Sequence, residues 1–390
     1  MRRAGVVVAI GTAQTLAWAS SYYLPAVLAD SMAAAVGVSP TFVFGAFSVS
    51  LVLMGFMGPA IGRHIDEFGG RKVLVSSALV LPVGLLLLAV SQGPWSLGLA
   101  WIVLGVGMAL GLYHTALATL ASMYGHAART PITGITLMAG FASTLGWPVS
   151  AWLDHAIGWR GACVTWAIVH IAVTLPCYLA AVPRRVARHP HDAADGDATA
   201  QSTPPPPRYA MPLIAFAFAI IAFVGTAMAS HLPRLLQDTG ASAAGAIAAA
   251  ALFGPAQVAA RFVEFLAAHR WRPHPIHVAR LSAILHPIGA GLLAAAGGGG
   301  VAAPAFTLLH GAGNGLLTIS RGTLPLALFG PTGYGYRQGL IGAGAQLAQA
   351  AAPIAFGVLL DAAGANAALA VSGTLSFAAF AAFVALRPRA

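Results

Sequence analysis

The chain has 390 residues, of which 58% are hydrophobic and 8% are charged, and its mean hydropathy is +0.80. A soluble domain cannot cover so much apolar surface, so the composition excludes a soluble globular protein and indicates several membrane spans. The formal net charge is +10, but the basic residues are scattered over short loops without interleaved aromatics, which excludes a nucleic-acid partner. Both cysteines, Cys163 and Cys177, fall in apolar stretches, so neither a disulfide framework nor a metal site is indicated.

Twelve apolar segments are long enough to cross a membrane, which takes about 20 residues each. The first lacks an Ala-x-Ala cleavage site and is interpreted as a retained span. A polar stretch over 183–209, rich in Arg, Asp and Pro, separates the sixth segment from the seventh and is interpreted as a linker. We therefore predict an all-α membrane protein with twelve transmembrane helices in two pseudo-symmetric six-helix bundles, 1–182 and 210–390. The predicted spans are 5–29, 41–61, 73–91, 95–123, 131–153, 161–182, 210–232, 242–268, 276–296, 301–329, 338–360 and 365–386.

The basic residues predict the orientation. Of the twenty Lys and Arg residues, two lie inside spans, and only Arg160 and Arg234 fall on the side opposite the linker. The remaining sixteen fall on the linker side, which places the linker and both termini in the cytoplasm of an inner membrane protein.

Ordered repetition supports two related halves. Helix-packing glycines recur at matching places, and so does a set comprising a glycine, a proline and an aspartate. The matching residues are Gly107 with Gly311, Gly111 with Gly315, Gly134 with Gly339, Pro148 with Pro353, and Asp154 with Asp361.

The most charged stretch follows the second span and reads Gly62-Arg63-His64-Ile65-Asp66-Glu67-Phe68-Gly69-Gly70-Arg71-Lys72. Each charge would cost roughly 2.5 to 3.5 kcal/mol in hydrocarbon, so we expect a loop at the membrane surface. Asp66 and Arg71 are placed to pair with each other or with the end of a neighbouring helix.

This Gly-x-x-x-Asp-x-x-Gly-x-Arg-Lys pattern, in a chain with this layout, resembles the loop signature of the major facilitator superfamily of secondary transporters. The family usually has a basic residue directly after the Asp, where this chain has Glu67. The resemblance implies two parallel repeats, a substrate site near the midplane, and a conformational role for Gly62, Asp66, Gly69 and Arg71. We also predict a monomer without a cofactor.

Two of the later spans carry polar stripes that hydrocarbon would exclude. In 242–268 the stripe is Gln257, Arg261 and Glu264, and in 301–329 it is His310, Asn314, Thr318 and Arg321. Both arginines lie about two turns, ~12 Å, from the predicted cytoplasmic ends. Guanidinium groups bind carboxylates through a bidentate fork, so the pair indicates an anion site. The structural alternative is that Glu264 neutralises Arg261 while Arg321 caps a helix end or reaches the interface.

A narrower resemblance begins at Gln257-Val-Ala-Ala-Arg261, which is similar to the Asp-x-x-x-Arg segment of monocarboxylate transporters and to the equivalent arginine of oxalate/formate antiporters. In those relatives the arginine grips the substrate carboxylate. The stretch 134–159 is likewise similar to the fifth span of that group. Because Gln257 replaces the aspartate, an Asp/Arg proton relay does not carry over.

Further candidates for the binding site are aromatic. Tyr22 and Tyr23 lie in 5–29 near Trp18, and Tyr113 and His114 interrupt the apolar run of 95–123. Phenol and indole rings can close over a small ligand and donate a hydrogen bond, although aromatic packing alone would give the same pattern.

Proton coupling has few candidates. No Asp or Glu falls within the cores of the first six spans, which disfavours a cationic-drug antiporter, and Glu264 is the one carboxylate inside a predicted span. His114 and His310 are the other possible proton carriers. A uniporter or an anion exchanger stays open.

The chain has no phosphate-binding loop, no His-Glu-x-x-His and no nucleophile elbow, so we predict no enzymatic activity. We predict a transporter that moves a small organic anion, a mono- or dicarboxylate, by alternating access, as a symporter or by exchange. The alternatives are an efflux porter for a neutral or amphipathic compound and a non-transporting membrane receptor. The predicted partners are the substrate, the lipid bilayer and protons.

Overall fold

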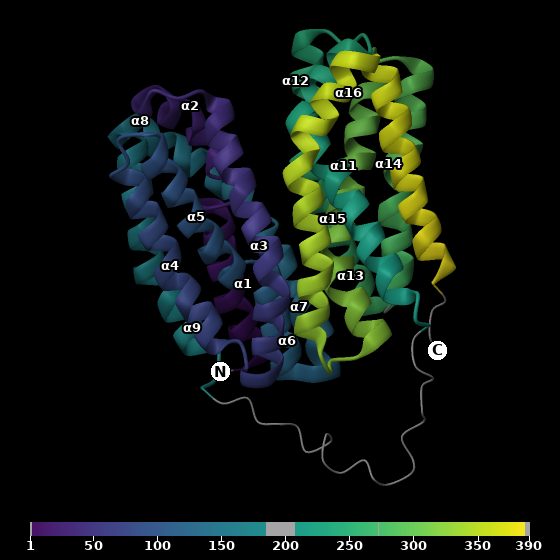
Figure 1. Ribbon diagram of the computed structural model, residues 1–390. Helices are drawn as coiled ribbons and strands as arrows, with labels where there is room; N and C mark the ends of the chain where they lie inside the picture. Colours follow the sequence, from purple (N-terminus) through teal and green to yellow (C-terminus); the bar gives the residue numbers. More distant parts are fainter. Residues whose placement is uncertain (1, 185–206, 272, 387–390) are drawn as a thin grey trace, which may run out of the picture.

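The computed structural model describes residues 2–184, 207–271 and 273–386, and these form helices without any β-strand. Two helical bundles stand side by side (Figure 1). The end where α9 finishes and α11 begins is called the linker end below, and the opposite end is called the far end. Most of the predicted linker, from 185 to 206, lies outside the described residues.

The first bundle follows the order of its predicted spans, but several spans are divided into two helices. Its helical elements are α1 (Arg3–Ser20), α2 (Pro25–Val36), α3 (Pro40–Phe68), α4 (Arg71–Ala89), α5 (Pro94–Gly111), α6 (Tyr113–Tyr124), η1 (Gly125–Ala128), α7 (Arg129–Ala139), α8 (Ala142–Val169), η2 (His170–Thr174) and α9 (Leu175–Ala181).

The second bundle begins after the linker, and its longest helix covers the last two predicted spans. Its helices are α11 (Ala210–Asp238), α12 (Ala243–Ala251), α13 (Phe253–Arg270), α14 (Pro275–Ala296), α15 (Ala302–Phe329) and α16 (Tyr334–Ala385).

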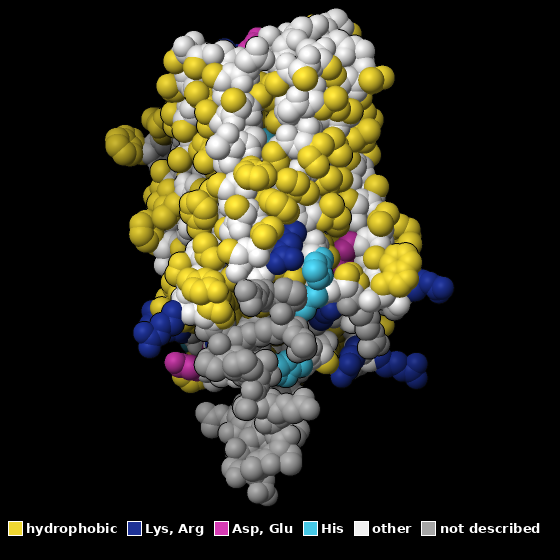
Figure 2. Space-filling model, turned by 90° about the vertical axis from the view of Figure 1, so that its right-hand side faces the viewer, with side chains coloured by type: hydrophobic (Ala, Val, Ile, Leu, Met, Phe, Trp, Pro, Cys, Tyr) yellow, Lys and Arg dark blue, Asp and Glu magenta, His cyan; other side chains and the backbone are white. Residues whose placement is uncertain are grey.

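The surface suits a bilayer. Figure 2 shows hydrophobic side chains over most of the outer face of the second bundle, while Lys, Arg and His gather toward the linker end. By length and hydropathy, eight helical stretches among the described residues can cross a membrane, and two of them, Pro94–Ala181 and Tyr334–Ala385, are far too long for one crossing. This all-helical arrangement confirms the predicted fold class, while the count of twelve crossings stays a prediction that the structure fits.

The two bundles share matching local features. α8 turns at Gly158 (φ 74°) and α16 turns at Gly364 (φ 78°), where only glycine adopts the backbone without strain. A few residues before each turn, an aspartate accepts a hydrogen bond from a helix near the start of the same bundle, which is α2 in the first bundle and α11 in the second. The Ser31 hydroxyl donates to Asp154 at 2.7 Å, and Arg234 donates to Asp361 at 2.6 Å. Asp154 and Asp361, which the sequence repeats placed at matching positions, therefore make similar contacts in the structure.

The prediction of a loop over the charged stretch 62–72 is wrong. α3 continues to Phe68, and the chain breaks only at Gly69 and Gly70 before α4 begins. The helix can continue because it projects past the apolar core with its charged side chains exposed. The charges indicated the membrane boundary correctly, but they did not indicate where the helix ends.

The bundles touch near the linker end and stand apart toward the far end (Figure 1). α3 and α16 cross with almost no space between their backbones, since a Cβ added to Gly62 would lie 2.1 Å from the carbonyl oxygen of Gly335. The Asp66 carboxylate accepts hydrogen bonds from the backbone N–H groups of Gly335 and Tyr336, both at 2.8 Å. It therefore caps the start of α16 across the boundary between the bundles.

Arg71 makes its contacts within the first bundle. Its guanidinium donates to the backbone carbonyls of Leu179 at 2.8 Å and of Val182, at the end of α9. Asp66 and Arg71 thus each contact the end of a neighbouring helix and do not pair with each other. The sequence alone had allowed both arrangements.

Candidate functional site

The candidate site forms where helices are interrupted. α1 stops at Ser20 and α2 starts at Pro25, which fixes φ and has no N–H to continue the ladder. Tyr22 and Tyr23 lie in this gap, and Tyr113 follows a similar break at Leu112. Irregular backbone at membrane depth occurs where protein or a cavity covers it. The breaks therefore mark the centre of the bundle as the place where polar groups are tolerated.

Aromatic rings from the first bundle form one contiguous cluster at these breaks. The Trp18 ring centroid lies 4.8 Å from that of Tyr22 and 4.7 Å from that of Tyr113. Tyr22 and Tyr23 meet edge to face at 5.4 Å, and Tyr23 reaches Trp147 at 5.9 Å. The cluster faces the second bundle, where the Tyr22 side chain lies near Thr226 on α11.

Arg261 crosses from α13 toward that cluster. Its guanidinium donates to Thr318 Oγ1 at 3.0 Å, to Gln257 Oε1 at 3.2 Å and to the Gly315 carbonyl at 3.4 Å. These acceptors are neutral. They hold the guanidinium in one orientation without compensating its charge.

The same guanidinium reaches the first bundle. A Cβ added to Gly140 would lie 2.1 Å from Arg261 Nη1, so the side chain packs against the break between α7 and α8. Tyr23 and Tyr113 both lie near Arg261. The arginine is 6% exposed, and it touches both halves of the protein.

Arg321 on α15 also contacts the first bundle, where its Nη2 lies 3.3 Å from His114 Nε2. The Nε of Arg321 is buried without a hydrogen-bond partner among the described residues, and so is the Nε1 of Trp18. Both are donors, which is the arrangement that a bound acceptor would complete.

Neither guanidinium is neutralised by an ion pair. The ion pairs between described side chains are Arg234 with Asp238 and with Asp361, and they lie at the far end. Glu264 is 5% exposed on α13, but it forms no ion pair with Arg261, so neutralisation of Arg261 by Glu264 is not observed. Two cations therefore stand at the boundary between the bundles with neutral partners.

The remaining candidates are placed less centrally. Asn314 lies close to Gly225 on α11, where a Cβ would be 3.2 Å from its Oδ1, and it is not among the hydrogen-bond partners of Arg261. His114 packs against Gly342 of α16 as well as against Arg321. His310 does not reach the arginines. Its ring instead contacts His286 on α14, a residue that the sequence pattern did not single out.

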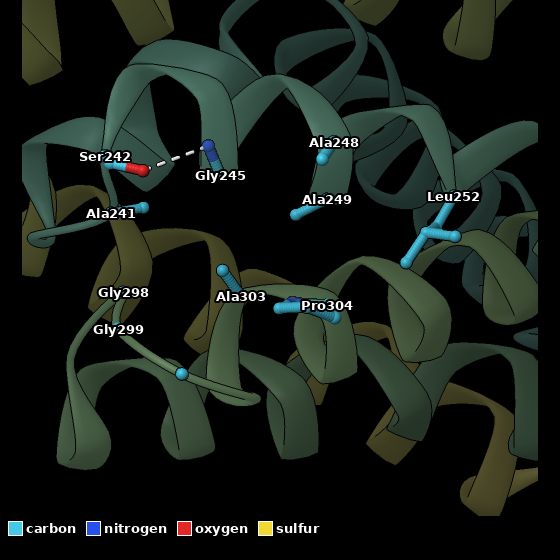
Figure 3. A pocket seen from close by; sticks show the side chains of 11 residues that line it. Ala241, Ser242, Gly245, Ala248, Ala249, Leu252, Gly298, Gly299, Ala303 and Pro304 are labelled. Atoms are coloured by element: carbon cyan, nitrogen blue, oxygen red, sulfur yellow. Dashed lines mark hydrogen bonds between the residues drawn. The ribbon is translucent and has the colours of Figure 1, made fainter.

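A separate cavity of about 310 Å³ lies at the far end, between α12 and the start of α15 (Figure 3). Small residues line it, including Gly245, Ala249 and Ala303. Its polar side chain, Ser242, accepts a hydrogen bond from the Gly245 N–H at 3.1 Å and so caps α12. None of the lining residues is charged, and neither Arg261 nor Arg321 is among them.

Two helical bundles with polar groups at their boundary are an arrangement typical of membrane transporters. A sequence model of the Major Facilitator Superfamily matches residues 10–324. The chain therefore belongs to the major facilitator superfamily, whose members are membrane transporters and not enzymes. No curated protein sequence matches the chain.

Solved structures share the fold at low sequence identity. A human organic anion transporter, MFSD10, superposes with a TM-score of 0.75 at 16% identity, over 98% of this chain and 100% of its own. The proton:xylose symporter XylE gives 0.74 at 14% identity, over 97% and 95%. The fucose transporter FucP of E. coli, in its outward conformation, gives 0.72 at 15% identity, over 97% of each chain.

Proposed function

We propose that the protein transports a small organic anion, a mono- or dicarboxylate, by alternating access of the halves 1–182 and 210–390. The observation that carries the proposal is the pair Arg261 and Arg321 at the boundary between the bundles, without a carboxylate ion pair among the described residues. Each such charge would cost roughly 2.5 to 3.5 kcal/mol at membrane depth on insertion scales. A substrate carboxylate would offset that cost.

The hydrogen bonds around Arg261 support substrate binding better than a purely structural role. Gln257, Thr318 and the Gly315 carbonyl fix the guanidinium plane, and fixed orientation lowers the entropy cost of binding a planar carboxylate. The place of Arg261 four residues after Gln257 also fits the resemblance to carboxylate porters. The aromatic cluster supplies an apolar wall for the rest of the substrate.

The contacts at the linker end support alternating access. Asp66 caps α16 across the boundary, and the α3 and α16 backbones meet at Gly62 and Gly335. Transport requires these contacts to break so that the site can open to the other side. We further propose that the linker end is cytoplasmic in an inner membrane, because most Arg and Lys residues lie there.

A second candidate function is efflux of a neutral or amphipathic compound, which the cluster of Trp18, Tyr22, Tyr23 and Tyr113 favours. In that case the rings would contribute most of the binding and the arginines would be architectural. A receptor that binds without transporting is a third candidate.

Counterflow in proteoliposomes tests the proposal. Vesicles are loaded with unlabelled lactate, succinate or benzoate, and the entry of the same labelled compound is measured against protein-free vesicles. We expect counterflow of at least one carboxylate, and we expect Arg261→Lys to reduce it about tenfold or more, because lysine cannot form the bidentate fork. The control is Arg234→Lys, whose ion pairs lie at the far end.

Folding is checked by the melting temperature of each variant. Undiminished counterflow in Arg261→Lys would refute the role of Arg261. Counterflow of uncharged aromatic compounds alone would favour the efflux porter, and binding of a carboxylate without counterflow would favour the receptor.

A further inference from the structure

Two buried histidines of the second bundle form a pair that the anion site does not use. His286 on α14 and His310 on α15 are each 4% exposed, and their Nδ1 atoms lie 2.8 Å apart. Their ring centroids are 4.7 Å apart at an angle of 70°. At that distance one Nδ1 must carry a hydrogen and the other must accept it, so the two rings hold different tautomers.

The pair borders a small cavity of about 10 Å³, close to the volume that one water molecule requires. Ser282, Asn314 and Ser376 contribute polar side chains to its lining. The Nε2 atoms of both histidines and the Oγ of Ser376 are buried without a hydrogen-bond partner among the described residues. A buried polar atom that stays unpaired destabilises the fold, so the grouping of these atoms around one cavity indicates a binding site for a water molecule or a proton.

The geometry limits this site to one additional proton. In the neutral pair, the ring that donates through Nδ1 has a free Nε2 lone pair. A proton added there creates an imidazolium whose Nδ1–H still donates to the neighbouring ring, now through a stronger charge-assisted bond. A second proton would turn both Nδ1 atoms into donors and would break the bond.

Few groups compete for that proton. α11 presents Ile221 and Val224 to the cavity, and the rings of Phe253 on α13 and Phe306 on α15 stack on His310. α16 contributes Ser376. Of the residues that line the cavity, His286 and His310 are the ones that titrate. A proton held here would be a net charge added to the second bundle.

The polar face of α15 connects this pair with the anion site. Asn314 borders the cavity one turn from His310, and Thr318 follows one turn later and contacts Arg261. From His310 to Thr318 the helix rises ~12 Å. A proton and an anion at that separation attract each other enough to tighten the binding of either by about tenfold when the other is present, at an effective dielectric constant of ~20.

We infer that the His286–His310 pair binds the one proton that this transporter carries together with each anion. The inference rests on the proposed anion transport. The proton site and the anion site lie on the same bundle and share α15, so a proton on the histidines favours an anion at Arg261, and each leaves more readily after the other.

Proton-driven uptake tests the coupling. Proteoliposomes with an inwardly directed gradient of one pH unit take up labelled lactate or succinate, and one proton per anion supports accumulation of about tenfold. We expect His286→Gln and His310→Gln to lose this accumulation while exchange of external for internal anion continues, because exchange does not require net proton movement. His155→Gln, an exposed histidine on α8, is the control and should accumulate like the wild type.

Accumulation that persists in both variants would overturn the inference. If the wild type transports neither anion, the proposed function fails instead. Protonation of the His286–His310 pair can still be measured without any substrate. In ¹⁵N-histidine NMR spectra of protein in nanodiscs, the two signals lost in His286→Gln or His310→Gln should shift together as the pH is lowered and one proton binds. A pair that stays neutral over the whole pH range in which the protein stays folded would contradict the inference.

Discussion

Replacing Asp66 with Ala should open the linker end. The carboxylate accepts two hydrogen bonds of 2.8 Å from the first N–H groups of α16, across the boundary between the bundles. Loss of a helix cap of this kind costs about 1 to 2 kcal/mol. Because the contact exists only when the linker end is closed, that cost acts on the closed state alone and shifts the ratio of closed to open molecules by roughly 5- to 30-fold.

The assay is a distance distribution from pulsed electron resonance, with spin labels at Lys72 and Arg208 in a cysteine-free background. Both positions are exposed at the linker end, Lys72 in α4 of the first bundle and Arg208 just before α11 of the second. Asp66→Ala should enlarge the long-distance population, and Asp66→Asn should give an intermediate result because one amide oxygen still accepts. Glu67→Gln removes a neighbouring exposed charge and serves as the control. Identical distributions for Asp66→Ala and the wild type would refute the reasoning.

Two further predictions concern a close contact and a loop histidine. Gly140→Ala should weaken carboxylate binding about tenfold, because its Cβ would displace the Arg261 guanidinium, whereas Gly98→Ala meets open space and should bind normally. Isothermal titration of both variants decides this, and equal affinity would contradict the contact. His274 Nδ1 accepts from the Ile276 N–H at the start of α14, and burial lowers its pKa below the usual 6.5, with His277, Arg129 and Arg280 adding to the shift. Because the unfolded chain then binds more protons, this stabilisation is complete above about pH 6.5 and declines as the pH falls. His274→Asn keeps an acceptor and should flatten the fall in melting temperature below pH 6.5, and an unchanged fall would contradict this role.

The sequence predicted the fold because its signals are long and redundant. Hydrophobic length, the distribution of arginine and the ordered repeats, such as Asp154 with Asp361, all indicate the same arrangement. The helix breaks at Leu112 and Leu252 were not predicted, although Gly111 precedes the first and Gly254-Pro255 follows the second. Glycine and proline also occur inside continuous helices of this chain, as Pro148 does in α8, so only tertiary packing distinguishes a break from a continuous helix.

The candidate site was predicted in part. Helical spacing correctly grouped Gln257 with Arg261 and placed Thr318 on the face that meets them. The same spacing put His310 on that stripe, although its ring turns away to His286, which lies 24 residues earlier and carries no pattern of its own. Contacts between the bundles, such as Gly140 against Arg261, depend on how two halves dock, and no periodicity within one helix encodes that.

The most direct test of the central claim compares a carboxylate with its uncharged analogue. Purified protein is melted with benzoate and with benzamide, which have the same ring but differ in charge, and the comparison is repeated with Arg321→Gln and Arg261→Gln. If the two guanidinium groups hold the substrate, benzoate should raise the melting temperature of the wild type, benzamide should not, and both variants should lose the response. Equal stabilisation by the two compounds, or an undiminished benzoate response in both variants, would contradict an anion site between the bundles.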